Sequence, residues 1–205
     1  MTLTTTSTSC PETPSALADL PCETCDTGHA LTEQSFDCRA FRDTLGSFAT
    51  GVTVITALAP NGEKSGEPIG LTISSFNSVS LDPPLILWSL SADSPSLAAF
   101  RAATHYAVNV LSVDQQEISN RFAARGGDRF AGVALRQGKH GAPLIDGCCA
   151  WFECANEAQH AGGDHLIFVG RVEHFVPGEA TSPLIFHAGR YRELLVEFDD
   201  DADEH

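Results

Sequence analysis

Between residues 69 and 96, small hydroxyl side chains lie between apolar runs, and a double proline interrupts the pattern. β-Branched and aromatic residues favour extended structure, and proline cannot donate a backbone hydrogen bond to a sheet. We therefore predict strands at residues 68–73, 77–81 and 85–90, with Pro83-Pro84 between strands. Because small hydroxyls at strand ends can hydrogen-bond a flat polar ring and its phosphate, the segment favours a nucleotide-like ligand over a simple packed core.

The rest of the chain continues this pattern of short extended segments, with helices inserted between them. Phe41, Leu45 and Phe48 recur at helical spacing and give the first helix an apolar face. Three helices are expected, capped by Asp37, by Asp93 or Ser94, and by Asp114. Further strands are predicted at 52–58, 105–111, 149–158, 164–175, 184–187 and 191–196, with an Asn61-Gly62 hairpin turn.

This order of elements predicts a mainly β fold. Strands dominate and do not alternate strictly with helices, which favours an antiparallel barrel with peripheral α-helices over a doubly wound sheet. The P-loop and the GxGxxG fingerprint are both absent, so a Rossmann-type nicotinamide site is disfavoured.

The net charge of −15 is concentrated at the two ends of the chain. Residues 1–40 and 197–205 hold twelve acids and one base, which leaves 15 acids against 11 bases in the body, a net charge of −4. We expect a disordered leader at 1–35, one domain at 36–196 and a disordered acidic tail at 197–205. No basic footprint for nucleic acid, no apolar run of membrane length and no secretory signal is visible, so cytoplasmic residence is expected.

Seven cysteines and eight histidines raise the question of a metal or redox site. Cys22 and Cys25 have CxxC spacing, which leaves open either an incidental pair in a flexible leader or a metal or redox function. Three later cysteines lie in an apolar run and are expected to pack as small hydrophobic residues. The histidines show no HExxH or paired-ligand spacing, so no metal site is predicted.

Several motifs, taken in order, carry a resemblance to a known family. They are Phe48-Ala-Thr-Gly-Val-Thr-Val-Ile-Thr56, Gly70-Leu-Thr-Ile-Ser-Ser-Phe-Asn-Ser-Val-Ser80, Asp82-Pro-Pro-Leu85, Ala107-Val-Asn-Val-Leu111, Phe122-Ala123 with Asp128-Arg-Phe130, Gly163-Asp-His165 with Gly170, and Gly189-Arg-Tyr191. Together they make residues 36–195 resemble the flavin reductase-like family, the reductase components of two-component flavin-dependent monooxygenases.

The resemblance implies an FMN-binding split β-barrel with Greek-key character, built as a homodimer. It implies FMN or FAD as flavin, NADH or NADPH as hydride donor, and a separate monooxygenase that receives the reduced flavin. Two other functions stay open: a non-catalytic flavin-binding or carrier protein, and a split-barrel oxidoreductase that uses tightly bound flavin on its own small substrate.

The resemblance also assigns roles to individual residues. Thr72, Ser74, Ser75 and Phe76 would border the isoalloxazine, partly through backbone groups, and Ser89, Ser94 and Ser96 would receive the flavin phosphate. Both assignments have an alternative without a ligand. Thr72 to Ser80 could be only the polar face of a strand, and Ser94 could be only a helix cap.

His165 is the expected catalytic residue, placed beside the stacking site of the nicotinamide, although a partly exposed histidine at a strand end is the plain alternative. Arg190 and Tyr191 are further candidates for flavin contact. Arg125 and Arg129 lie in a predicted loop that either closes over the nicotinamide or holds solvated arginines.

Overall fold

A computed structural model describes residues 36–60 and 65–194 of the chain. The predicted leader, the CxxC pair, the Asn61-Gly62 turn and the acidic tail lie outside these residues. No helix in the described ranges is both long enough and apolar enough to cross a bilayer.

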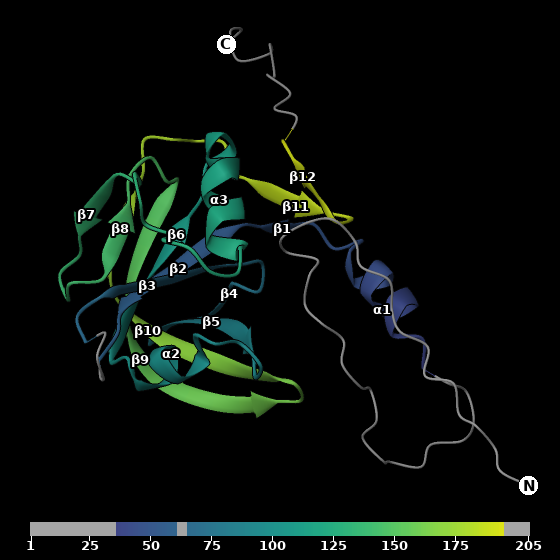
Figure 1. The fold of residues 1–205 in the computed structure, drawn as a ribbon, viewed down its shortest axis with the longest axis horizontal. Coiled ribbons are helices and arrows are strands. Elements are labelled where there is room, and N and C mark those ends of the chain that lie inside the picture. The colour runs from purple at the N-terminus through teal and green to yellow at the C-terminus, as the bar shows by residue number, and fades with distance from the viewer. Residues whose placement is uncertain (1–35, 61–64, 195–205) are drawn as a thin grey trace, which may run out of the picture.

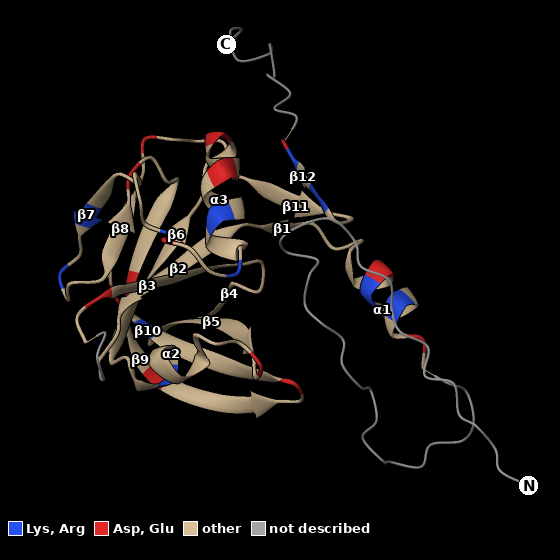
Figure 2. Ribbon diagram, in the orientation of Figure 1, with Lys and Arg blue, Asp and Glu red and all other residues tan. Residues whose placement is uncertain are grey.

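Four helical segments and twelve strands make up the described chain. The helices are α1 (Cys38–Leu45), α2 (Leu97–Ala102), the 3-10 helix η1 (Val113–Gln115) and α3 (Gln116–Ala123). The strands are β1 (Thr50–Gly51), β2 (Thr53–Leu58), β3 (Pro68–Ile73), β4 (Asn77–Leu81), β5 (Pro84–Ser91), β6 (His105–Val110), β7 (Leu135–Gln137), β8 (Pro143–Ile145), β9 (Ala150–Gly162), β10 (His165–Pro177), β11 (Ile185–His187) and β12 (Arg190–Arg192). Charged side chains are sparse on the long strands and gather on α1, α3, β12 and the connecting loops (Figure 2).

Seven strands form one antiparallel sheet in the order β3-β2-β6-β9-β10-β5-β4. The sheet curls until β3 comes into contact with β5, yet β3 and β4 at its two ends are not paired with each other (Figure 1). The result is the expected mainly β, split-barrel architecture. Two small sheets, β1-β11-β12 and β7-β8, lie beside it.

Two apolar clusters stabilise this fold. Inside the curled sheet, the Trp88 ring stacks on its cross-strand partner Phe168 at 4.2 Å and makes edge contacts with Phe100 and Tyr106. Aromatic pairs of this kind contribute beyond the apolar area they bury. The second cluster joins β2 and β6 to α3 through residues such as Phe122, so it fixes α3 over the sheet.

The first helix forms where its cap predicted. The Asp37 carboxylate accepts hydrogen bonds from the backbone N–H groups of Arg39 (2.9 Å) and Ala40 (3.0 Å). Its predicted apolar face, however, is not buried: Phe41, Leu45 and Phe48 are 49%, 58% and 75% exposed.

Other local predictions were wrong at element ends. Pro84 begins β5 instead of preceding it, because the first residue of a strand can lack an N–H donor. Neither Asp93 nor Ser94 caps α2, which begins after Ser96, and Asp114 lies inside η1 instead of capping a helix. The sequence analysis also missed β7 and β8, which are short and lie between glycine- and proline-containing turns.

Of the three cysteines expected to pack as small hydrophobic residues, Cys148 and Cys154 are fully buried, and Cys149 is only half-buried. Burial raises the pKa of the Cys148 and Cys154 thiols to about 12.

Candidate flavin and nicotinamide site

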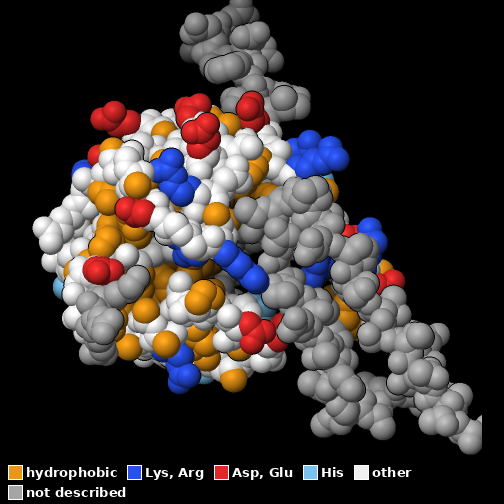
Figure 3. Space-filling view, in the orientation of Figure 1, with side chains coloured by type: hydrophobic (Ala, Val, Ile, Leu, Met, Phe, Trp, Pro, Cys, Tyr) orange, Lys and Arg blue, Asp and Glu red, His pale blue; other side chains and the backbone are white. Residues whose placement is uncertain are grey.

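A cavity of about 250 Å³ opens where the curled sheet is split. Its walls come from the end of β3, the end of β5, the turn before α2, the first residue of β10 and the loop after α3. Figure 3 shows that basic side chains cross the middle of this face, between hydrophobic surfaces. The lining residues are Leu71–Ser75, Ser89–Ser91, Asp93–Ser96, Phe122, Ala123, Arg125, Arg129 and His165.

Seven of the ten predicted site residues line this single cavity, although they come from separate parts of the chain. They are Thr72, Ser74, Ser75, Ser89, Ser94, Ser96 and His165. Their convergence follows from the pairing of β10 with β5, in which His165 lies opposite Ser91.

The hydroxyl groups of the cavity wall are mostly engaged by the protein. Thr72 Oγ1 donates to the carbonyl oxygen of Ser119 on α3 at 2.7 Å. Ser75 Oγ accepts from the Ser89 N–H at 2.9 Å and donates to the Ser89 carbonyl at 3.1 Å. These two hydroxyls therefore fix the shape of the wall, and the surface they leave for a ligand is small, polar and close to the backbone.

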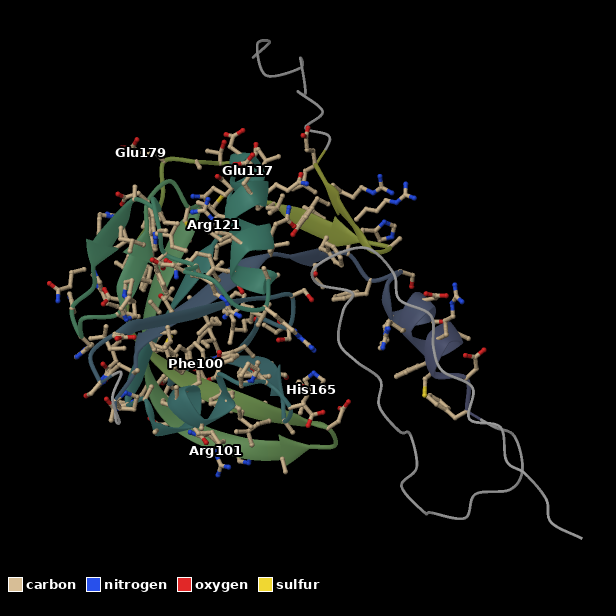
Figure 4. The ribbon with its side chains drawn as sticks, in the orientation of Figure 1. Phe100, Arg101, Glu117, Arg121, His165 and Glu179 are labelled. Atoms are coloured by element: carbon tan, nitrogen blue, oxygen red, sulfur yellow. The ribbon has the colours of Figure 1, made fainter. Side chains whose placement is uncertain are left out.

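The turn before α2 is also internally bonded. Ser94 Oγ accepts from the Ser96 N–H at 3.3 Å, and Ser96 makes no side-chain cap to the helix. Since α2 has only six residues, its dipole is short, and the turn contributes mainly serine hydroxyls and backbone N–H groups to the cavity. Arg101, the nearest basic residue in sequence, does not line the cavity and lies on α2 (Figure 4).

His165 begins β10, near the hairpin that joins β9 to β10 (Figure 4). Its Nδ1 lies 2.8 Å from Asp164 Oδ1, and this hydrogen bond lowers the pKa of the Asp164 carboxyl. The side chain of His165 is 29% exposed, at the cavity edge. Because Asp164 occupies Nδ1, the other ring nitrogen, Nε2, remains available to a ligand. The sequence analysis did not identify Asp164 as this partner.

The three arginines around the loop after α3 differ in what they can bind. Arg129 donates to the carbonyl oxygens of Gly70 (2.7 Å) and Ala124 (2.8 Å), and its burial lowers its pKa. Arg121 donates to the carbonyl oxygen of Ala131. Arg125 is exposed and lines the cavity, with no hydrogen bond or ion pair to any residue in the described ranges. Its guanidinium is thus free to meet an anionic ligand.

Phe76, Arg190 and Tyr191 do not line the cavity. Phe76 packs its ring against Phe152 at 5.8 Å. The Tyr191 hydroxyl lies 2.8 Å from Ser119 Oγ and donates to Asn120 Oδ1 at 2.9 Å, which holds β12 against α3. Arg190 is exposed on β12. Within one chain, Phe76 and Tyr191 therefore support the fold around the cavity.

The flavin reductase like domain matches residues 45–195. The FMN reductase (NADH) SmoA of Agrobacterium fabrum is 44% identical over 80% of this chain and 90% of its own length. The reductase component of the flavin-dependent trigonelline monooxygenase of Acinetobacter baylyi is 44% identical over 75% of this chain.

Among solved structures, a Streptomyces globisporus NADH:FAD oxidoreductase in complex with NAD and FAD fragments superposes with a TM-score of 0.71 at 38% identity, covering 85% of this chain and 100% of that one. The chain spans about half the length of two of the curated relatives, 45% and 48%. The family match covers well over half of the sequence, and the fold agrees with it. The chain therefore belongs to the flavin reductase-like family.

Proposed function

We propose that this chain is an NAD(P)H-dependent flavin reductase, which transfers a hydride from the nicotinamide to FMN or FAD. The observation that carries the proposal is the cavity itself. The serine residues expected to bind flavin line it together with His165 and the free guanidinium of Arg125. NADH is the favoured donor, because SmoA is an FMN reductase (NADH) and the Streptomyces enzyme is an NADH:FAD oxidoreductase. The first of these enzymes uses FMN and the second FAD, so both flavins are candidates.

The cavity fits a flat ring with an anionic tail. Ser74 and the backbone of the neighbouring residues present polar atoms with little bulk, and Arg125 offers a charge for a phosphate. Hydride transfer itself is the chemistry of the two cofactors, so the protein has to bind and orient them. In this proposal the isoalloxazine binds against the serine- and threonine-containing wall of the cavity. His165, held by Asp164, positions the nicotinamide and does not act as a strong base.

We further propose that the protein works as a homodimer and supplies reduced flavin to a separate monooxygenase. The homodimer is what the family resemblance implies, with two chains framing each flavin site. The cavity of one chain, about 250 Å³ against the ~300–1,000 Å³ typical of small-molecule sites, leaves room for a second chain to add to its wall. Exposed apolar side chains are available for such packing, among them Leu81 on the edge strand β4 (95% exposed) and Phe175 on β10 (67%). The monooxygenase follows from the Acinetobacter relative, a reductase component. Cytoplasmic residence stays a prediction.

The deciding experiment measures oxidation of NADH and of NADPH with FMN, FAD or no added flavin. A reductase treats flavin as a substrate, so the rate should rise hyperbolically with free flavin and continue for many turnovers. A flavin carrier would retain flavin without oxidising nicotinamide. An enzyme with tightly bound flavin would reach its full rate at one flavin per chain. Either of the last two results would replace the proposal.

A further inference from the structure

Two histidine side chains from separate elements converge on one carboxylate oxygen of Glu173. His105 Nε2 lies 3.5 Å from Glu173 Oε2, and His140 Nε2 lies 3.1 Å from the same oxygen. The two imidazole rings stack with centroids 3.9 Å apart and an interplanar angle of 12°. All three ligand-type atoms lie within 4.8 Å of one another.

The sheet fixes two of these side chains. His105 is the first residue of β6 and pairs with Ala155 of β9. Glu173 is the extra residue of a β-bulge in β10, because Val172 pairs with Cys154 and His174 pairs with the next residue of β9. Bulges redirect a side chain and are common beside functional sites. Strands β6 and β10 flank β9, so the imidazole and the carboxylate reach each other across it.

His140 is held in place by the turn between β7 and β8. The buried Glu153 carboxylate accepts from the Lys139 N–H at 2.5 Å, directly before His140. The Gly138 N–H donates to the Ala142 carbonyl (2.9 Å), and Gly141 has a φ of +84°, which closes the turn. A buried carboxylate from β9 therefore anchors the backbone that carries the second imidazole.

The groups around the cluster leave its three ligand atoms available. Thr104 Oγ1 lies 3.1 Å from His105 Nδ1, so one ring nitrogen is engaged and the other faces Glu173. An outer contact of this kind orients histidine ligands at metal sites. Arg171 lies 3.7 Å from the other oxygen of Glu173, Oε1, and is itself paired with Glu157 at 3.0 Å. Arg171 thus approaches the Glu173 oxygen that the two imidazoles do not contact.

We propose that His105, His140 and Glu173 form a binding site for a divalent transition metal ion, with Zn²⁺ as the best-suited ion. Two imidazoles and one carboxylate, with water as a fourth ligand, are a common zinc ligand set. With zinc–ligand bonds of about 2.0–2.2 Å, tetrahedral ligands lie about 3.4 Å apart. The two distances to Glu173 Oε2, 3.1 and 3.5 Å, bracket that separation. The two rings, which lie nearly parallel at 12°, would have to tilt apart so that both Nε2 lone pairs point at one ion. Spacing along the sequence did not indicate this site, because each ligand comes from a different element.

The site is distant from the proposed flavin cavity. Glu173 lies eight residues along β10 from His165, which corresponds to about 26 Å at about 3.3 Å per residue. A metal ion there would tie the β7–β8 turn to the sheet and would not touch the cavity. Its binding is therefore measurable independently of flavin reduction.

The experiment titrates the full chain with Zn²⁺ by calorimetry, after chelator treatment and removal of the chelator. Cys22 and Cys25 are replaced by serine in every sample, because their thiols would also bind zinc. The test variants are His140→Ala and Glu173→Gln, and the control is His160→Ala, an exposed histidine of β9 outside the cluster. A Co²⁺ titration reports the ligand type, since thiolate ligands add an intense charge-transfer band that nitrogen and oxygen ligands lack.

We expect one ion per chain, no thiolate band, and unchanged affinity in His160→Ala. Loss of an outer partner alone typically costs 10- to 100-fold in metal affinity, so each test variant should lose about 100-fold or more. No binding in the parent protein would mean that the cluster is only a hydrogen-bonded ion pair, and binding that survives both test substitutions would place the ion elsewhere. Either result overturns the proposal. Retained flavin reduction in each variant would show that it folds.

Discussion

Replacing Ser75 by alanine removes the hydroxyl that joins the end of β3 to β5. The pairing of β4 with β5 extends to Leu87, opposite Asn77. Ser89, two residues further, faces the same edge of β5 and has no strand neighbour there among residues 36–60 and 65–194. The Ser75 hydroxyl bonds both its N–H and its carbonyl, at 2.9 and 3.1 Å. One side chain thus replaces a strand partner at the split of the barrel.

Ser75→Ala should destabilise the protein by about 2 kcal/mol, since each neutral hydrogen bond contributes about 1 kcal/mol. For a domain of this size, that corresponds to a fall in Tm of about 4–8 °C. Because Ser75 and Ser89 also line the cavity, the KM for flavin should rise. Urea unfolding followed by tryptophan fluorescence measures the first effect, and steady-state NADH oxidation measures the second.

Ser74→Ala is the matched control. Ser74 lines the same cavity, and its hydroxyl makes no hydrogen bond within the described ranges. The control should alter the KM for flavin with a change in unfolding free energy below about 0.5 kcal/mol. Equal destabilisation by the two substitutions would refute the bridging role of Ser75.

His165→Ala should slow flavin reduction or raise the KM for the nicotinamide while the melting temperature stays unchanged; kinetics identical to the parent would remove its assigned role. Gly170→Ala should destabilise by about 3 kcal/mol in urea unfolding, because a methyl group there would lie 2.1 Å from the hydroxyl oxygen of the buried Tyr106, and a neutral substitution would contradict this packing. Burial raises the pKa of Cys148 and Cys154 from 9.0 to about 12, so the folded state retains their protons and stability present below pH 9 is lost as the pH rises toward 12. Between pH 8 and 10 the loss should be about 1.4 kcal/mol per thiol, and urea unfolding of a chain with both thiols replaced by alanine should show a correspondingly smaller decline.

Local signals predicted the strands well where the sequence has strong turn chemistry. The strands at 68–73 and 77–81 were predicted with the bounds found for β3 and β4, because apolar runs there end at serine-rich and proline-containing turns. Helix caps were less predictable. Asp93, Ser94 and Asp114 are all suitable capping residues, and the choice among neighbouring candidates depends on how the preceding strand ends.

The sequence predicted which residues line the cavity better than it predicted their hydrogen bonds. Sequence motifs identified most of the cavity wall, but they could not show that the hydroxyls of Thr72 and Ser75 donate to backbone carbonyls of the protein itself. They also could not distinguish Arg129 from Arg125, because that difference depends on where the Gly70 carbonyl lies after folding. Contacts between distant segments decide these roles.

As the extra residue of a bulge, Glu173 has no partner of its own in the ladder between β10 and β9. On either side of it, Val172 and His174 already pair with consecutive residues of β9. Deletion of the single codon for Glu173 would restore a regular ladder and leave every flanking side chain on its present face. Homologous chains can therefore gain or lose this carboxylate in one evolutionary step, without disturbing the barrel.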